Sequence, residues 1–99
     1  EAAKSRQRPH SVAVRGAQPA AQDADGLLQL VAAVRARRSA QGWAAVDTMT
    51  QVSSQDEAAA ALGITQQAVS KRLAAACWAE ENAALPALRR LLAAAQGPE

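Results

Sequence analysis

The chain has 99 residues, of which 49% are hydrophobic, and its 11 Lys and Arg against 9 Asp and Glu give a net charge of +2. Alanine supplies 28 of the hydrophobic residues, whereas Phe and Tyr are absent and Ile occurs once. Strands favour β-branched and aromatic residues, while Ala and Leu are strong helix formers. The composition therefore excludes a β-rich fold and predicts an all-α domain, a small bundle of four to five helices.

The chain also lacks the residues that several classes of protein need. No apolar run approaches the about 20 residues that span a bilayer, so no membrane association is expected. One cysteine excludes an internal disulfide, one histidine makes no metal site, and we expect no cofactor and a cytoplasmic location. Paired carboxylates, a Ser/His/Asp set and a Gly-rich phosphate loop are missing, so we do not expect an enzyme.

Residues 1–24 show no hydrophobic period, and Pro9, Gly16 and Pro19 interrupt any regular element. The segment is basic through Lys4, Arg6, Arg8 and Arg15. It is predicted to be a flexible basic arm or linker, either a tether to a preceding N-terminal domain or an arm for the DNA minor groove. Because the chain begins at Glu1 rather than Met, it is expected to be either a processed protein or a fragment of a longer one.

Residues 25–96 are predicted to form the helical domain. Its first helix follows Asp25 as N-cap and ends at Gly42, with one buried stripe made by Leu27, Leu30, Val31 and Val34. The basic residues of its last turn, which either complement the helix dipole or contact phosphates, are Arg35, Arg37 and Arg38.

Four further helices are predicted in chain order. Residues 43–49 form a short one, and a capping box of Ser54 and Glu57 starts the next, with each side chain bonding the other residue's backbone amide. Thr65 caps a helix from Gln66 to about Cys77. The last helix covers residues 80–96, where Pro86 either starts a new helix or kinks it. Trp43 and Trp78 are expected in the core, with base stacking as the alternative.

The informative segment is residues 55–73. Two helices that cross steeply through a short turn need a small residue where they touch, which Ala59 supplies, and a left-handed turn residue, which Gly63 supplies. Leu62, Ile64 and Val69 are expected to fill the wedge between the helices.

The helix after this turn has a polar outer face. A rotation of about 100° per residue places Leu73 and Ala76 beside an inward Val69, and it points Gln67 and Lys71 outward. Residues 64–79 contain no Asp or Glu, which would face phosphates. Gln can pair with adenine, Lys with guanine and Ser with either, so this face suits the DNA major groove.

The segment resembles the helix-turn-helix of bacterial and phage DNA-binding proteins, in which Ala is followed by Gly after four residues and by Val or Ile after six more. Ala59, Gly63 and Val69 match this spacing. The run Thr65-Gln66-Gln67 resembles the start of the recognition helix in some phage repressors, where the glutamines touch bases, and Gln55 resembles a glutamine that braces the DNA backbone.

Residues 25–92 as a whole are more similar to the C-terminal helix-turn-helix of SatD-like and MarR-annotated actinobacterial regulators, or to a sigma-factor region 4. No wing is expected, because residues from Ala74 onward read as helix.

The sequence thus predicts a sequence-specific DNA-binding module of a bacterial transcriptional regulator, located in the cytoplasm at the nucleoid. The residues expected to contact double-stranded DNA are Gln55, Thr65, Gln66, Gln67, Ser70, Lys71 and Arg72. The alternatives are a helix-turn-helix that docks on a protein such as RNA polymerase, and the DNA-binding tail of a recombinase. A homodimer is expected to form through Leu85, Leu88, Leu91 and Leu92, unless this stripe is simply core.

Overall fold

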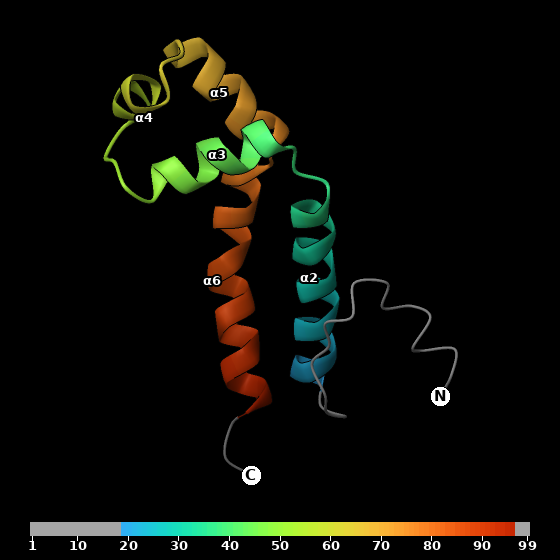
Figure 1. Ribbon diagram of the computed structural model, residues 1–99. Coiled ribbons are helices and arrows are strands. Elements are labelled where there is room, and N and C mark those ends of the chain that lie inside the picture. The colour runs from blue at the N-terminus through green and yellow to red at the C-terminus, as the bar shows by residue number, and fades with distance from the viewer. Residues whose placement is uncertain (1–18, 97–99) are drawn as a thin grey trace. The chain divides into compact units, whose positions relative to one another are not determined.

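The computed structural model describes residues 19–96 (Figure 1). Every regular element in that range is a helix, which confirms the all-α prediction. No strand follows the helix Gln66–Ala75 in the described residues. None of these helices has the length and apolar character needed to cross a membrane. The helices are α2 (Pro19–Ala36), α3 (Ala40–Met49), α4 (Gln55–Leu62), α5 (Gln66–Ala75) and α6 (Trp78–Ala95).

The chain divides into two compact units. The first, which we call the central unit, is Val34–Glu81 and contains α3, α4 and α5, with the end of α2 and the start of α6. The second, the flanking unit, holds the chain on either side of it, Glu1–Ala33 and Asn82–Glu99. The central unit includes all the residues that the sequence analysis assigns to DNA contacts.

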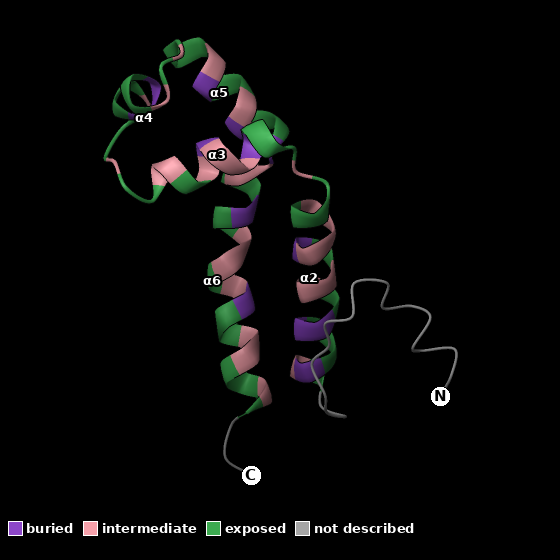
Figure 2. Cartoon of the chain, viewed as in Figure 1, coloured by how far each residue is buried: buried purple, intermediate pink, exposed green. Residues whose placement is uncertain are grey.

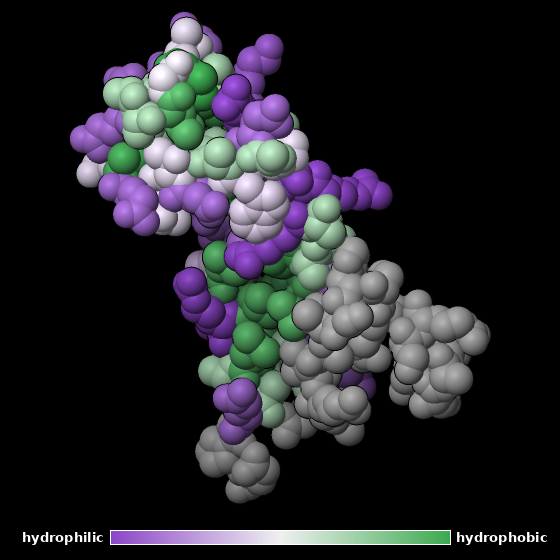
Figure 3. Space-filling model, in the orientation of Figure 1, coloured by the Kyte–Doolittle hydropathy of each residue, from purple (hydrophilic) through white to green (hydrophobic). Residues whose placement is uncertain are grey.

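In the flanking unit, α2 and α6 run in opposite directions (Figure 1). Figure 3 shows hydrophobic side chains over α6 on the face in view. Of the predicted leucine stripe, Leu88 is buried, whereas Leu85, Leu91 and Leu92 are half-buried. Leu30 is 61% exposed, so the expectation that it belongs to a buried stripe of α2 is wrong.

The first helix begins earlier than the sequence analysis expects. It starts at Pro19 rather than after Asp25, so Asp25 lies inside α2, where it is buried, and is not an N-cap. Proline is favoured at the first helical position because its missing N–H would have no partner there. The alanines that follow favour the helix enough to offset the cost of about 1 kcal/mol at Gly26. The last six residues of the predicted arm, 19–24, are therefore helical, and residues 1–18 lie outside the described range.

The break between α2 and α3 depends on a serine and not on Gly42. Ser39 is the N-cap of α3, and its Oγ accepts a hydrogen bond of 3.0 Å from the Gly42 N–H. Gly42 itself is buried inside α3, where a Cβ would lie 3.4 Å from the Cβ of Ala76. The tightest contact of that Cβ would be 3.3 Å to Ser39 Oγ, the capping oxygen, so the glycine leaves room for the cap. The prediction of Gly42 as a helix stop is wrong.

The boundary between α5 and α6 also differs from the prediction. The helix expected to reach about Cys77 ends at Ala75, and α6 begins at Trp78 rather than at residue 80. Cys77 lies between them with φ 56°, and it is the sole non-glycine residue with a positive φ in the described range. Pro86 does not start a new helix, because α6 continues through it, and a kink at this residue stays a prediction.

Candidate nucleic-acid interface

The turn between α4 and α5 has the geometry that Gly63 predicts. Gly63 has φ 70° and ψ 32°, in the left-handed region. The N–H of Gly63 donates to the Ala60 carbonyl at 3.3 Å, and the N–H of Ile64 donates to the Ala59 carbonyl at 3.1 Å. This pair of bonds is a Schellman motif, which closes the end of α4. Because no neighbour lies within 4 Å of a Cβ at position 63, the glycine is needed for its φ alone.

The start of α5 is capped by Thr65, as predicted. Its Oγ1 accepts a hydrogen bond of 3.0 Å from the Ala68 N–H. One lone pair of the hydroxyl oxygen therefore serves the helix, while the second lone pair and the hydroxyl hydrogen remain for another partner. Three residues, Gly63 to Thr65, thus connect α4 to α5.

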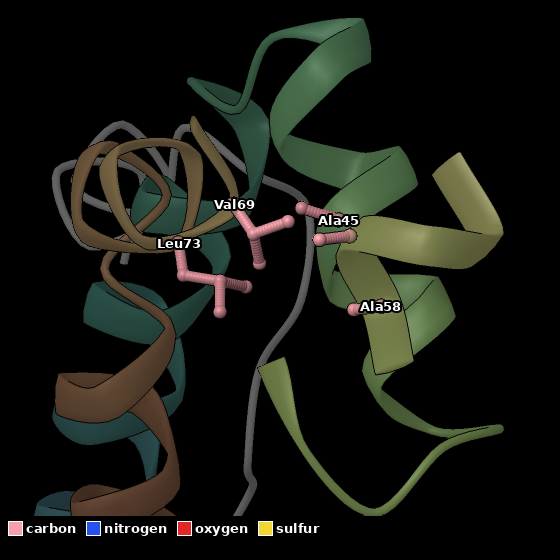
Figure 4. Packing of buried hydrophobic residues seen from close by; sticks show 5 residues of the cluster. Ala45, Ala58, Val69 and Leu73 are labelled. Carbon is pink, nitrogen blue, oxygen red and sulfur yellow. The ribbon is translucent and has the colours of Figure 1, made fainter. Parts of the chain in front are cut away.

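The inner face of α5 packs on an alanine-rich core. Val69 is fully buried and Leu73 nearly so, and both point toward Ala45 of α3 and Ala58 of α4 (Figure 4). Leu62 and Ile64 are half-buried against this cluster, together with Val46, Met49, Val52 and Trp78. The predicted wedge residues therefore do pack between the helices.

The outer face of α5 is polar and exposed (Figure 2). Gln66, Gln67, Ser70 and Lys71 are all exposed, and the rotation predicted for α5 is confirmed by this burial pattern. Within residues 19–96, none of these four side chains makes a hydrogen bond or an ion pair. They form a surface that is open to a ligand and contains no carboxylate.

The two other predicted contact residues are less open. Gln55, the first residue of α4, and Arg72, on the flank of α5, are both half-buried. Beside Gln55, the capping box is only half as predicted: the Glu57 N–H donates to Ser54 Oγ at 3.1 Å, but Glu57 Oε1 accepts from the Ser53 N–H at 2.6 Å rather than from Ser54. A carboxylate therefore lies at the start of α4, next to Gln55.

A buried arginine, Arg38, binds the far end of α5, and no local sequence pattern predicts this role. The Arg38 side chain is 1% exposed, and its Nε donates to the Ala76 carbonyl, just past the end of α5, at 2.8 Å. Its second nitrogen donates to Glu81 Oε1 at 2.5 Å. The guanidinium also lies 4.8 Å from the ring centroid of Trp43, close enough for a cation–π contact.

Glu81 is shared between two arginines. Its other oxygen accepts from Arg35, whose Nε lies 3.0 Å away and whose terminal nitrogen forms an ion pair with it. These bonds, from Arg35 first and then from Arg38, hold the pKa of the Glu81 carboxyl below its ordinary value, while burial works in the opposite direction. The same pairing raises the pKa of Arg35.

Two of the three arginines of the predicted basic cluster are thus engaged within the chain, and one of these, Arg38, has a buried side chain. Arg35 and Arg38 serve Glu81, and only Arg37 is exposed without a partner in the described range. Glu81 itself has no sequence signature, because its partners lie 43 and 46 residues away.

The central unit carries no net charge. Its five basic residues are Arg35, Arg37, Arg38, Lys71 and Arg72, and its five acidic residues are Asp47, Asp56, Glu57, Glu80 and Glu81. With two cations bound to Glu81, the cations left for phosphates are Arg37, Lys71 and Arg72. No group of His, Cys, Asp and Glu in residues 19–96 has the arrangement to hold a metal ion.

Comparison with protein-family models, with curated proteins and with solved structures gives no match to this chain.

Proposed function

We propose that the central unit binds double-stranded DNA and reads base edges in the major groove with the outer face of α5. The observation that carries this proposal is the set of four exposed, unpartnered polar side chains on one face of a helix that follows a three-residue turn. Amides can pair bidentately with adenine, a lysine ammonium can reach guanine, and a hydroxyl can serve either base. The absence of any carboxylate from this face supports the same assignment.

A helix that reads bases behind a short turn defines the class of helix-turn-helix DNA-binding proteins. Within that class, we propose a bacterial transcriptional regulator that acts at the nucleoid. The support is the resemblance of residues 55–73 to bacterial and phage helix-turn-helix segments, together with the left-handed Gly63 and the buried Val69 that such segments need.

The proposed contacts fall into two groups. The exposed residues of α5 are assigned to base edges: Gln66, Gln67, Ser70 and Lys71. Gln55 and Arg72, both half-buried, are assigned to the DNA backbone, where Arg72 extends its long stem to a phosphate. Thr65 caps α5 with one lone pair of its hydroxyl oxygen, so a DNA contact would use the hydroxyl hydrogen or the second lone pair.

Two copies of the chain are expected to act together. One central unit offers a single reading helix and three available cations, which is little phosphate neutralisation for one complex. A dimer on a pseudo-palindrome with half-sites about one helical turn apart would double the number of reading helices and of available cations. Because Leu88 is already buried in the chain, such a dimer would use Leu85, Leu91 and Leu92 of the predicted stripe. Sedimentation of the chain, free and with DNA, tests this: a monomer in both would remove the dimer.

A salt titration tests DNA binding itself. A duplex that the chain selects from a random pool is labelled, and its affinity is measured by fluorescence anisotropy at several salt concentrations. Three available cations predict a slope of log K against log salt of about −3 for each bound central unit. No binding at low salt, or a slope near zero, would remove the proposal.

Two substitutions on the same helix separate base reading from phosphate contact. Gln67→Ala is expected to lose about 1–3 kcal/mol of preference at one base pair. Arg72→Ala is expected to weaken binding to every duplex alike and to make the salt slope shallower by about one unit. If Gln67→Ala lowers the affinity for all single-base variants equally, the outer face of α5 does not enter the groove.

One observation favours a second candidate, a helix-turn-helix that docks on another protein. The central unit is electroneutral, and Glu57 places a negative charge beside Gln55. Neither feature assists the approach of a polyanion. The salt titration separates the two candidates, because a protein-docking module would show no affinity for duplex DNA at low salt.

A further inference from the structure

The beginning of α5 is fixed by its own chain, but the end of α5 depends on Arg38. The guanidinium binds the Ala76 carbonyl, faces Trp43 of α3 and pairs with Glu81 in the first turn of α6. One side chain thus joins the end of α5 to α3 and α6, and it is 1% exposed while it does so.

These contacts use properties that only arginine has. A guanidinium is planar and donates in several fixed directions, so it can bond a carbonyl and a carboxylate while its plane contacts an aromatic ring. A lysine in the same place keeps the charge but presents one compact ammonium without that fork. The site is therefore specific for the geometry of the arginine, beyond its charge.

The core beneath α5 gives little resistance to tilting. It is built from Ala45, Ala58 and Ala59 against Val69 and Leu73, and alanines offer shallow ridges. The ten residues of α5 span about 15 Å, so a tilt of about 10° at Gly63 moves the middle of the helix by about 1 Å. Side chains that pair with base edges depend on hydrogen-bond geometry of that precision.

We propose that Arg38 is a positioning residue that sets the direction of α5 and thereby aims Gln67, Ser70 and Lys71. The effect of Arg38 on DNA reading rests on the proposed function. Its effect on the direction of α5 is independent of that function. Arg38 does not contact DNA, because its side chain is buried inside the central unit.

The experiment compares Arg38→Lys with Ser54→Ala in the full chain. Ser54→Ala removes the cap of α4 and destabilises the same unit without touching the end of α5. Each protein is titrated with the selected duplex and a scrambled duplex, at one salt concentration and at a temperature where circular dichroism shows full helicity. Arg38→Lys is expected to lower the ratio of the two affinities about tenfold, the equivalent of one lost charge-assisted hydrogen bond, whereas Ser54→Ala keeps the ratio.

Amide hydrogen exchange supplies a readout that needs no DNA. In Arg38→Lys, the amides of Ala76 and Cys77 are expected to exchange about tenfold faster, while those of Ala68 and Val69 in the first turns are unchanged. If Arg38→Lys does not fold, Glu81→Gln loosens the same guanidinium and is read in the same way.

Each result decides something. An unchanged affinity ratio in Arg38→Lys, or an equal loss in Ser54→Ala, would overturn the positioning role. If the native chain shows no preference between the duplexes, the proposed function fails, and the exchange data alone judge Arg38. Unchanged exchange at Ala76 and Cys77 would then overturn the proposal.

Discussion

The two ends of α5 are held by different kinds of interaction. At its beginning, the partners lie within five residues along the chain: Thr65 caps the Ala68 amide, and Gly63 and Ile64 close the end of α4. At its end, Arg38 reaches Ala76 across 38 residues and Glu81 across 43. The interactions at the beginning are therefore local in the chain, whereas those at the end need Arg38, α3 and α6 to be in place.

This difference has an energetic counterpart. Helix caps each contribute about 1 kcal/mol, and their groups remain partly in water. The groups at the far end are buried and charged, so pairing them offsets a desolvation cost and gives little net stability. Breaking such a pair is costly, however, because one charge is then left buried alone. The far end should therefore be more sensitive to single substitutions than the near end.

The largest expected effect is at Glu81. Glu81→Ala leaves the buried guanidinium of Arg38 without a carboxylate, and we expect a loss of about 3 kcal/mol in the free energy of unfolding. Urea denaturation measures it. Glu80→Ala is the matched control, because Glu80 is the exposed neighbour in the same turn, and its change should stay within about 0.5 kcal/mol. Equal effects of the two changes would contradict the importance of the pair.

A smaller effect is expected at the near end of α5. Gly63→Val forces a β-branched residue to φ 70°, and we expect a loss of about 2 kcal/mol. Gly26→Ala is the control, because Gly26 lies in α2, has no neighbour within 4 Å of a Cβ and no positive φ, so the change should stabilise the chain by up to about 1 kcal/mol. If Gly63→Val costs nothing, the left-handed turn is wrong. If it costs more than Glu81→Ala, the comparison between the two ends is reversed.

The same contrast explains what the sequence predicted. The turn at Gly63, the cap at Thr65 and the inward Val69 follow from residues close together in the chain, and all three agree with the structure. The partners of Arg38 could not be predicted, because no local pattern relates residue 38 to residues 76 and 81. The start of α2 does not follow from the sequence, because a proline such as Pro19 can either break a helix or occupy its first turn.

The pH dependence of stability tests the contribution of the charge on Glu81. Bonds from Arg35 and Arg38 lower the pKa of Glu81 in the folded chain, so its contribution is fully present above the unfolded pKa of about 4.3 and is lost as the pH falls through the folded pKa. We expect the difference in unfolding free energy between the native chain and Glu81→Gln to be constant near neutral pH and to shrink below about pH 4. A difference that grows on acidification would mean that the folded pKa is raised.

The smallest expected effect is a gain, at Cys77. This residue lies between α5 and α6 with φ 56°, a conformation that costs a residue with a Cβ about 1 kcal/mol more than it costs glycine. Cys77→Gly removes that strain but also removes a half-buried side chain, so we expect a net stabilisation of about 0.5 kcal/mol, seen as a rise of a few degrees in Tm. Ala75→Gly, two residues earlier inside the helix, is the matched control and should cost about 1 kcal/mol. If Cys77→Gly destabilises the chain as much as Ala75→Gly does, the packing of the Cys77 side chain outweighs the strain of its backbone. The far end of α5 would then be held by side-chain contacts alone.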